Sequence, residues 1–109
     1  MIPLSAGDKM YYVDEKSGVK FILQPVTGET EDNFLAIMEE FKTAGKSNRE
    51  QLPVLNKLFN FFVVGWEGKD IKPFPDNGNP ARFFNYKFKD ALTSKAIEMC
   101  GLGVDEVKN

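Results

Sequence analysis

The sequence predicts one α+β domain, in which an N-terminal β-hairpin packs on three to four α-helices. Residues 10–26 combine β-forming side chains with a polar turn, whereas residues 28–64 and 79–100 repeat apolar side chains at helical spacing. The chain has 109 residues, which is enough for one hydrophobic core and too few for two. We therefore expect one domain over residues 1–103, followed by a flexible tail over residues 104–109.

The hairpin is expected over residues 10–26. Its first strand is rich in tyrosine and valine, and residues 14–18 form a polar turn that ends in glycine. One face of its second strand carries the apolar side chains of Val19, Phe21 and Leu23. Residues 2–4 could add a short edge strand and so make a small antiparallel sheet. Because a lone hairpin is marginal in water, it must pack on helices or pair with another chain.

The first helix is expected over residues 28–44. Thr30 suits the N-cap position, and the acidic residues that follow it suit the positive end of the helix dipole. Gly45 stands at the C′ position, where glycine commonly ends a helix. Apolar side chains recur at i, i+3, i+4 and i+7, namely those of Phe34, Ile37, Met38 and Phe41.

A second helix is expected between residues 47 and 64, with two alternatives for its start. Ser47 and Glu50 form a capping-box signature, but Pro53 would then lie inside the helix. We favour a start near Leu52, which places Pro53 at the first helical position. The apolar stripe consists of Leu55, Leu58, Phe59 and Phe62, and Phe61, Val63 and Val64 widen it. Such a helix lies either at the centre of the fold or in contact with a partner protein.

A loop is expected over residues 65–78, which hold several glycines and prolines. Asn79 and Pro80 then open another helical segment, with asparagine as the cap and proline at N1. A break near Asn85 would divide this segment into two helices. One helical face is expected to hold Phe84, Phe88, Ala91, Leu92 and Lys95, and Ala96, Met99 and Cys100 extend it.

The sequence argues against an enzyme. It has no histidine, which is the commonest general base and metal ligand, and it has no glycine-rich phosphate loop. The one cysteine, Cys100, lacks an activating base and falls on an apolar helix face. We therefore expect a packed thiol, no catalytic residue, no cofactor and no metal.

The net charge of −2 argues against a general nucleic-acid-binding protein. Four basic residues fall in one segment, Arg82, Lys87, Lys89 and Lys95, and we expect them on solvated helix faces. The longest apolar run, over residues 61–64, is too short to span a membrane. The first residues lack the pattern of a signal peptide, so we expect a cytoplasmic protein.

Aromatic side chains are the remaining signal, with ten Phe, three Tyr and one Trp. Phe74 lies between two prolines in an extended loop, where it either folds back onto the core or docks on a partner. Trp66 presents the same two alternatives. The candidate partner-binding residues are Phe61, Phe62, Trp66, Phe74 and Phe83. The hairpin edge and the many aromatic residues also favour self-association.

The stretch Val64-Gly65-Trp66-Glu67-Gly68, followed by Pro73-Phe74, resembles the tail assembly chaperones of long-tailed bacteriophages. In that family an apolar helix often ends in a similar W-E-G turn, and a charged stretch, a Pro-Phe element and a closing helix follow. The N-terminal half is also similar in layout. One departure is residues 75–80, which replace the Ser/Thr-containing helix start of the family.

The resemblance implies a non-catalytic protein that binds the tape-measure protein and helps to recruit tail-tube subunits. It further implies a protein of the host cytoplasm that is absent from the mature virion, and a short product made before a translational frameshift. An aromatic-rich small domain can shield apolar helices, which is compatible with this role. Two alternatives are a structural virion or connector protein and a small inhibitor that binds a host protein.

Overall fold

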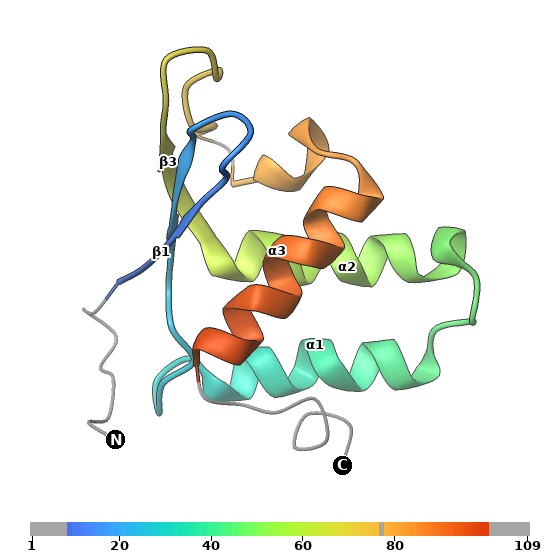
Figure 1. Cartoon of the computed structure of the whole chain (residues 1–109). Coiled ribbons are helices and arrows are strands. Elements are labelled where there is room, and N and C mark those ends of the chain that lie inside the picture. Colours follow the sequence, from blue (N-terminus) through green and yellow to red (C-terminus); the bar gives the residue numbers. More distant parts are fainter. Residues whose placement is uncertain (1–8, 77, 101–109) are drawn as a thin grey trace.

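A three-stranded antiparallel sheet lies against three α-helices in the computed structural model, which describes residues 9–76 and 78–100 (Figure 1). The elements in chain order are β1 (Met10–Val13), β2 (Lys20–Leu23), α1 (Glu31–Thr43), α2 (Asn48–Phe62), β3 (Val63–Glu67), the 3-10 helix η1 (Pro80–Phe83) and α3 (Tyr86–Met99). The predicted α+β class and the hairpin are confirmed, with three α-helices. The predicted strand at residues 2–4 and the tail at 104–109 lie outside the described residues.

The third strand of the sheet comes from residues where the sequence predicted a helix end and a loop. β3 pairs with β2 in the order β1-β2-β3, and Phe21 lies opposite Trp66. A β-bulge opposite Ile22 and Leu23 interrupts this pairing. The prediction was wrong because all four residues of 61–64 are apolar. An unbroken apolar run does not show where helical spacing changes to strand spacing. Val63 and Trp66 are buried while Val64 is exposed, as expected for a strand that covers a core.

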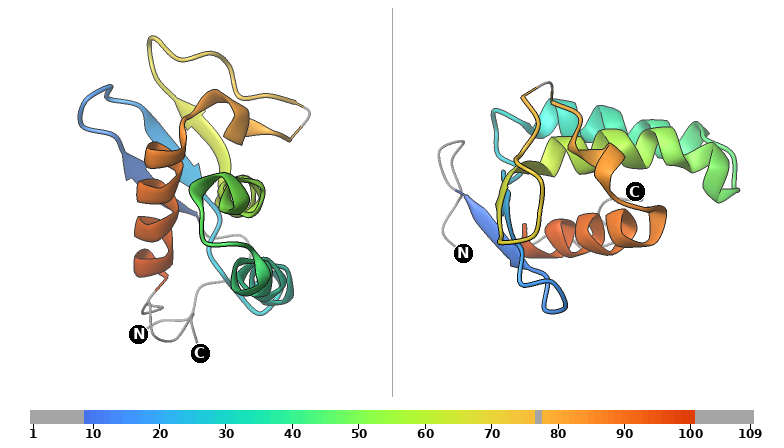
Figure 2. Two further views of the ribbon diagram at one scale, coloured as in Figure 1. Left: turned by 90° about the vertical axis from the view of Figure 1, so that its right-hand side faces the viewer. Right: turned by 90° about the horizontal axis from the view of Figure 1, so that it is seen from above.

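The helices all lie on one side of the sheet (Figure 1). α1 and α2 run side by side (Figure 2), and α3 runs obliquely to them (Figure 1). α2 packs against both of the other helices, and its contact with α3 is more extensive than its contact with α1. The largest fully buried apolar side chains come from all of these layers and include Phe21, Leu23, Phe34, Leu55, Phe59, Phe62, Val63 and Leu92.

α2 begins at Asn48, so the predicted start near Leu52 was wrong. Both halves of the capping box are present: the Ser47 hydroxyl accepts from the Glu50 N–H at 3.1 Å, and the Glu50 carboxylate accepts from the Ser47 N–H at 3.3 Å. Pro53 lies inside the helix. Its missing N–H leaves the carbonyl of Arg49 without a helical partner, but Arg49 lies on the exposed first turn, where water can bond this carbonyl.

The ends of α1 differ from the expected caps. Thr30 holds the N-cap position, but its hydroxyl donates to the Pro25 carbonyl at 3.0 Å and does not cap the helix. Gly45 follows the helix without a left-handed φ angle, unlike Gly18 and Gly78. A Cβ on Gly45 would lie 1.7 Å from the Glu50 carboxylate. Glycine at this position therefore leaves room for the capping box of α2.

The predicted break near Asn85 is confirmed, because η1 ends at Phe83 and α3 starts after Asn85. The Asn85 side chain accepts from the Phe88 N–H at 2.9 Å and caps α3. The buried face of α3 consists of Lys89, Leu92, Thr93 and Ala96. Ala91, which was expected on this face, is exposed. Thr93 can be buried because its hydroxyl donates to the Lys89 carbonyl at 2.8 Å.

The capping box predicts the effect of Ser47→Ala. Losing the side-chain acceptor should lower the free energy of unfolding by about 1 kcal/mol, measured by urea denaturation. Asn48→Ala, at the neighbouring exposed position, is the control and should change stability by less than about 0.5 kcal/mol. Equal effects of the two substitutions would show that α2 does not depend on this cap.

Candidate interaction site

The five aromatic residues expected to bind a partner divide into two clusters within the fold. In the first cluster, Phe61 and Phe62 each pack on Phe34, with ring centroids 5.9 Å apart in both pairs. Phe61 is 8% exposed and Phe62 is fully buried. Both rings therefore join the end of α2 to α1, and in this conformation they offer almost no surface to a partner.

Trp66 forms the second cluster with Phe74 and Phe83. The Phe74 ring centroid lies 4.8 Å from that of Trp66, and the Phe83 centroid lies 5.9 Å from it, both edge-to-face. The Trp66 indole N–H donates to the carbonyl of Lys72 at 2.6 Å. Trp66 is 8% exposed, and the other two rings are half-buried. The loop after β3 returns to the Trp66 indole, so Phe74 folds back onto the protein, which is one of the two alternatives expected for it.

The basic segment contributes three exposed cations and one buried cation. Arg82, Lys87 and Lys95 are exposed, as expected. Lys89 is only 4% exposed, and its ammonium donates to the side-chain carbonyl of Asn56 on α2 at 2.5 Å. Burial lowers the pKa of Lys89. The expectation of a solvated position was wrong for Lys89, because its partner is 33 residues away in the sequence.

The thiol of Cys100 is half-buried and donates to the sulfur of Met10 at 3.8 Å. Burial raises the pKa of Cys100, which is the opposite of what an activated nucleophile needs. Within residues 9–76 and 78–100, no three histidine, cysteine, aspartate or glutamate side chains gather where they could hold a metal ion. In the same ranges, no helix is both long enough and apolar enough to cross a membrane.

One surface hollow is a groove between all three α-helices, with a volume of about 580 Å³. We call it the three-helix groove. α3 runs obliquely across α2, so that α1 and α3 diverge from one end of α3 to the other (Figure 1). Its lining consists of Met38, Phe41 and Lys42 from α1, Gln51, Leu55 and Leu58 from α2, and Asp90, Thr93, Ser94 and Ile97 from α3.

The three-helix groove has an apolar floor and walls and a polar rim. Leu55 and Leu58 form the floor, at 2% and 3% exposure. Met38, Phe41 and Ile97 are half-buried, so part of each apolar side chain faces the groove. Lys42 on α1 and Asp90 on α3 place opposite charges on the two sides of the rim. This composition suits the binding of an apolar surface with charged flanks.

Four of the lining residues were expected on apolar helix faces, but the groove itself was not expected. Met38 and Phe41 belong to the predicted stripe of the first helix, and Leu55 and Leu58 belong to the stripe of the second. The sequence signal was that the apolar stripe of the second helix is wide. The groove depends on how α3 crosses α2, which involves contacts between distant segments and has no local sequence pattern.

The Trp66 cluster predicts a large effect of Trp66→Ala on stability. We expect a loss of about 3–5 kcal/mol in the free energy of unfolding, because the indole is buried and packs on four aromatic rings. Trp66→Phe keeps an aromatic ring but loses the bond to the Lys72 carbonyl, and should cost only about 1 kcal/mol. If Trp66→Ala costs no more than Leu35→Ala, a change at a residue that is 51% exposed, the indole does not anchor the loop.

Comparison with known proteins identifies no relative of this chain. No protein-family model matches it, and neither a curated protein nor a solved structure is significantly similar. A function must therefore be argued from the surface of this chain, and the three-helix groove is the strongest candidate among the described residues.

Proposed function

We propose that this protein is a non-catalytic assembly chaperone that holds an apolar helical segment of a partner in the three-helix groove. The observation that carries the proposal is the groove itself, in which Met38, Phe41 and Ile97 present apolar surface over a leucine floor. Apolar surface at the bottom of a polar-rimmed groove is typical of a site for an amphipathic helix.

The form of the groove suits a helix better than a small molecule. It is not an enclosed cavity, and its lining comes from three helices. Met38 contributes a flexible thioether, which can adapt to different apolar side chains. Lys42 and Asp90 lie on opposite sides, so a partner helix with an acidic flank toward α1 and a basic flank toward α3 would fit best.

We propose the tape-measure protein as the partner, because the sequence resembles tail assembly chaperones in the stretch from Val64 to Phe74. A long, largely helical protein exposes apolar faces until the tail tube surrounds it, and a shallow groove could cover such faces reversibly. The same resemblance supports recruitment of tail-tube subunits and action in the host cytoplasm. The protein would then leave before the particle is complete.

The test is co-expression with the tape-measure protein encoded in the same genome. The wild-type chain should keep that protein in the soluble fraction. Met38→Glu and Ile97→Glu place a charge in the groove and should lower the soluble amount at least roughly fivefold, since an uncompensated charge at an apolar contact costs more than 1 kcal/mol. Leu35→Glu, on the exposed side of α1, is the matched control and should have no effect.

Far-UV circular dichroism and thermal melting should show that all three variants stay folded, because the substituted side chains are exposed or half-buried. Equal loss of solubilisation in the groove variants and in Leu35→Glu would contradict the proposed site. A wild-type chain that does not raise the solubility of the tape-measure protein would contradict the proposed function. Detection of the chain in purified particles by mass spectrometry would favour the structural virion alternative.

A further inference from the structure

Another pocket lies at the turn of the hairpin, and we call it the hairpin pocket. It is a shallow hollow of about 390 Å³. It forms where the hairpin turn, the loop after β3 and the start of α3 come together (Figure 1). It shares no lining residue with the three-helix groove, so it is a separate site on the surface of the chain.

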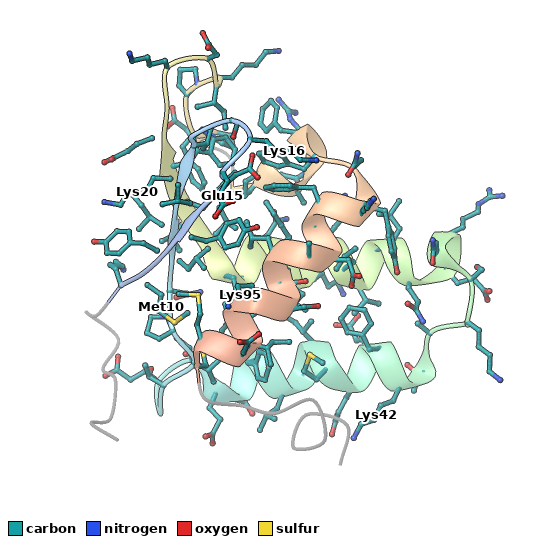
Figure 3. The ribbon with its side chains drawn as sticks, viewed as in Figure 1. Met10, Glu15, Lys16, Lys20, Lys42 and Lys95 are labelled. Carbon is teal, nitrogen blue, oxygen red and sulfur yellow. The ribbon has the colours of Figure 1, made fainter. Side chains whose placement is uncertain are left out.

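The hairpin pocket lies away from the points where the described chain begins and ends. Met10, where β1 starts, is at the opposite end of the hairpin from Glu15 and Lys16 (Figure 3). Cys100 follows the last turn of α3 and is close to Met10, because its thiol contacts the Met10 sulfur at 3.8 Å. Both ends of the described chain are therefore at the other end of the hairpin from this pocket.

Aromatic rings make up much of the lining of the hairpin pocket. Phe84 and Phe88 stack with their ring centroids 4.9 Å apart, and both contact Phe21, at 5.5 and 5.4 Å. Phe83 also lines the pocket. Phe83, Phe84 and Phe88 are half-buried, so part of each ring remains accessible. Such rings attract cations, because the face of an aromatic ring is the negative part of its quadrupole.

The charges at the rim of the hairpin pocket are both negative. Among the described residues that line it, the charged side chains are those of Asp14 and Asp70. One oxygen of Asp14 accepts from the N–H and the hydroxyl of Ser17, at 3.2 and 2.6 Å, and a carboxylate has room for further donors. Neither aspartate forms an ion pair with any residue that the structure describes. Rings and rim therefore favour the same kind of ligand, a cation.

We propose that the hairpin pocket binds an arginine side chain of a partner protein. The guanidinium would pack on the phenylalanine rings and donate to Asp14 and Asp70. Arginine suits this pocket better than lysine, because its planar group stacks on aromatic rings and holds its donors in a rigid fork. The chain makes a contact of this kind itself, since the guanidinium carbon of Arg82 lies 5.0 Å from the Phe83 ring centroid.

Other side chains would fit the hairpin pocket less well. A neutral apolar side chain would contact the rings but would take water from the two carboxylates without replacing it. An acidic side chain would be repelled by both aspartates. Because the three-helix groove is a separate site, a chain with an arginine bound here could hold a second partner segment at the same time.

Peptide binding to the purified, isotopically labelled chain tests this proposal by NMR, without any tape-measure protein. A capped Gly-Arg-Gly peptide should shift the amide signals of Ser17, Ile71 and Phe88 in a saturable way, with a Kd on the order of 1 mM. The same peptide with citrulline keeps the shape of arginine without its charge, and should bind at least roughly tenfold more weakly. The lysine peptide should bind roughly threefold more weakly than the arginine peptide.

Aspartate substitutions locate the bound peptide. Asp70→Asn removes one rim charge at an exposed position and should weaken the arginine peptide roughly fivefold. Asp76→Asn is the matched control, because Asp76 is exposed on the same loop outside the pocket, and it should leave binding unchanged. Both variants should keep the wild-type amide spectrum, since both side chains are exposed.

Several results would overturn the proposal. These are equal binding of the citrulline peptide, equal losses in Asp70→Asn and Asp76→Asn, and no shift at a peptide concentration of about 10 mM. Shifts at Met38 and Ile97 in place of those at the hairpin would locate the peptide in the three-helix groove and would also overturn it. Equal binding of the lysine peptide would overturn the choice of arginine.

Discussion

The direct passage from α2 into β3 is the constraint on which the rest of the structure depends. Phe62 ends the helix and Val63 begins the strand, with no residue between them. The backbone N–H of Gln24 donates to the Phe62 carbonyl at 2.8 Å, and its side-chain amide donates to the Phe61 carbonyl. Carbonyls at the end of a helix otherwise lack partners. Here the chain after β2 satisfies them and so bonds the helix to the sheet.

The position of α2 also determines how the remaining elements pack. Asn60 in its last turn accepts from the Ala81 N–H at 2.9 Å, which fixes η1 against α2. Lys89 donates to Asn56 one turn earlier and holds α3 across the same helix. Phe21, 1% exposed in the middle of β2, contacts the rings of Tyr12, Trp66, Phe84 and Phe88. Sheet and helices therefore share one core.

Local patterns predicted the parts of this fold that local interactions form. The hairpin, the first helix and the break near Asn85 follow from neighbouring residues, and the capping-box signature of Ser47 was visible although a start near Leu52 was favoured. β3 could not be predicted in this way, because its pairing joins residues as far apart as Phe21 and Trp66. For the candidate site, the sequence showed the apolar stripes of the helices. It did not show the groove between the helices, and it did not show that the aromatic candidates are buried.

The most direct test of the α2–β3 junction is native-state hydrogen exchange of the Gln24 amide, measured by NMR in increasing denaturant. If the junction unites the sheet and the helices, this amide should exchange only through global unfolding, with the same free energy as the most protected amides of α2. Exchange of Gln24 through a smaller opening, while the amides of α2 remain protected, would show that the sheet opens independently of the helices and would contradict this account.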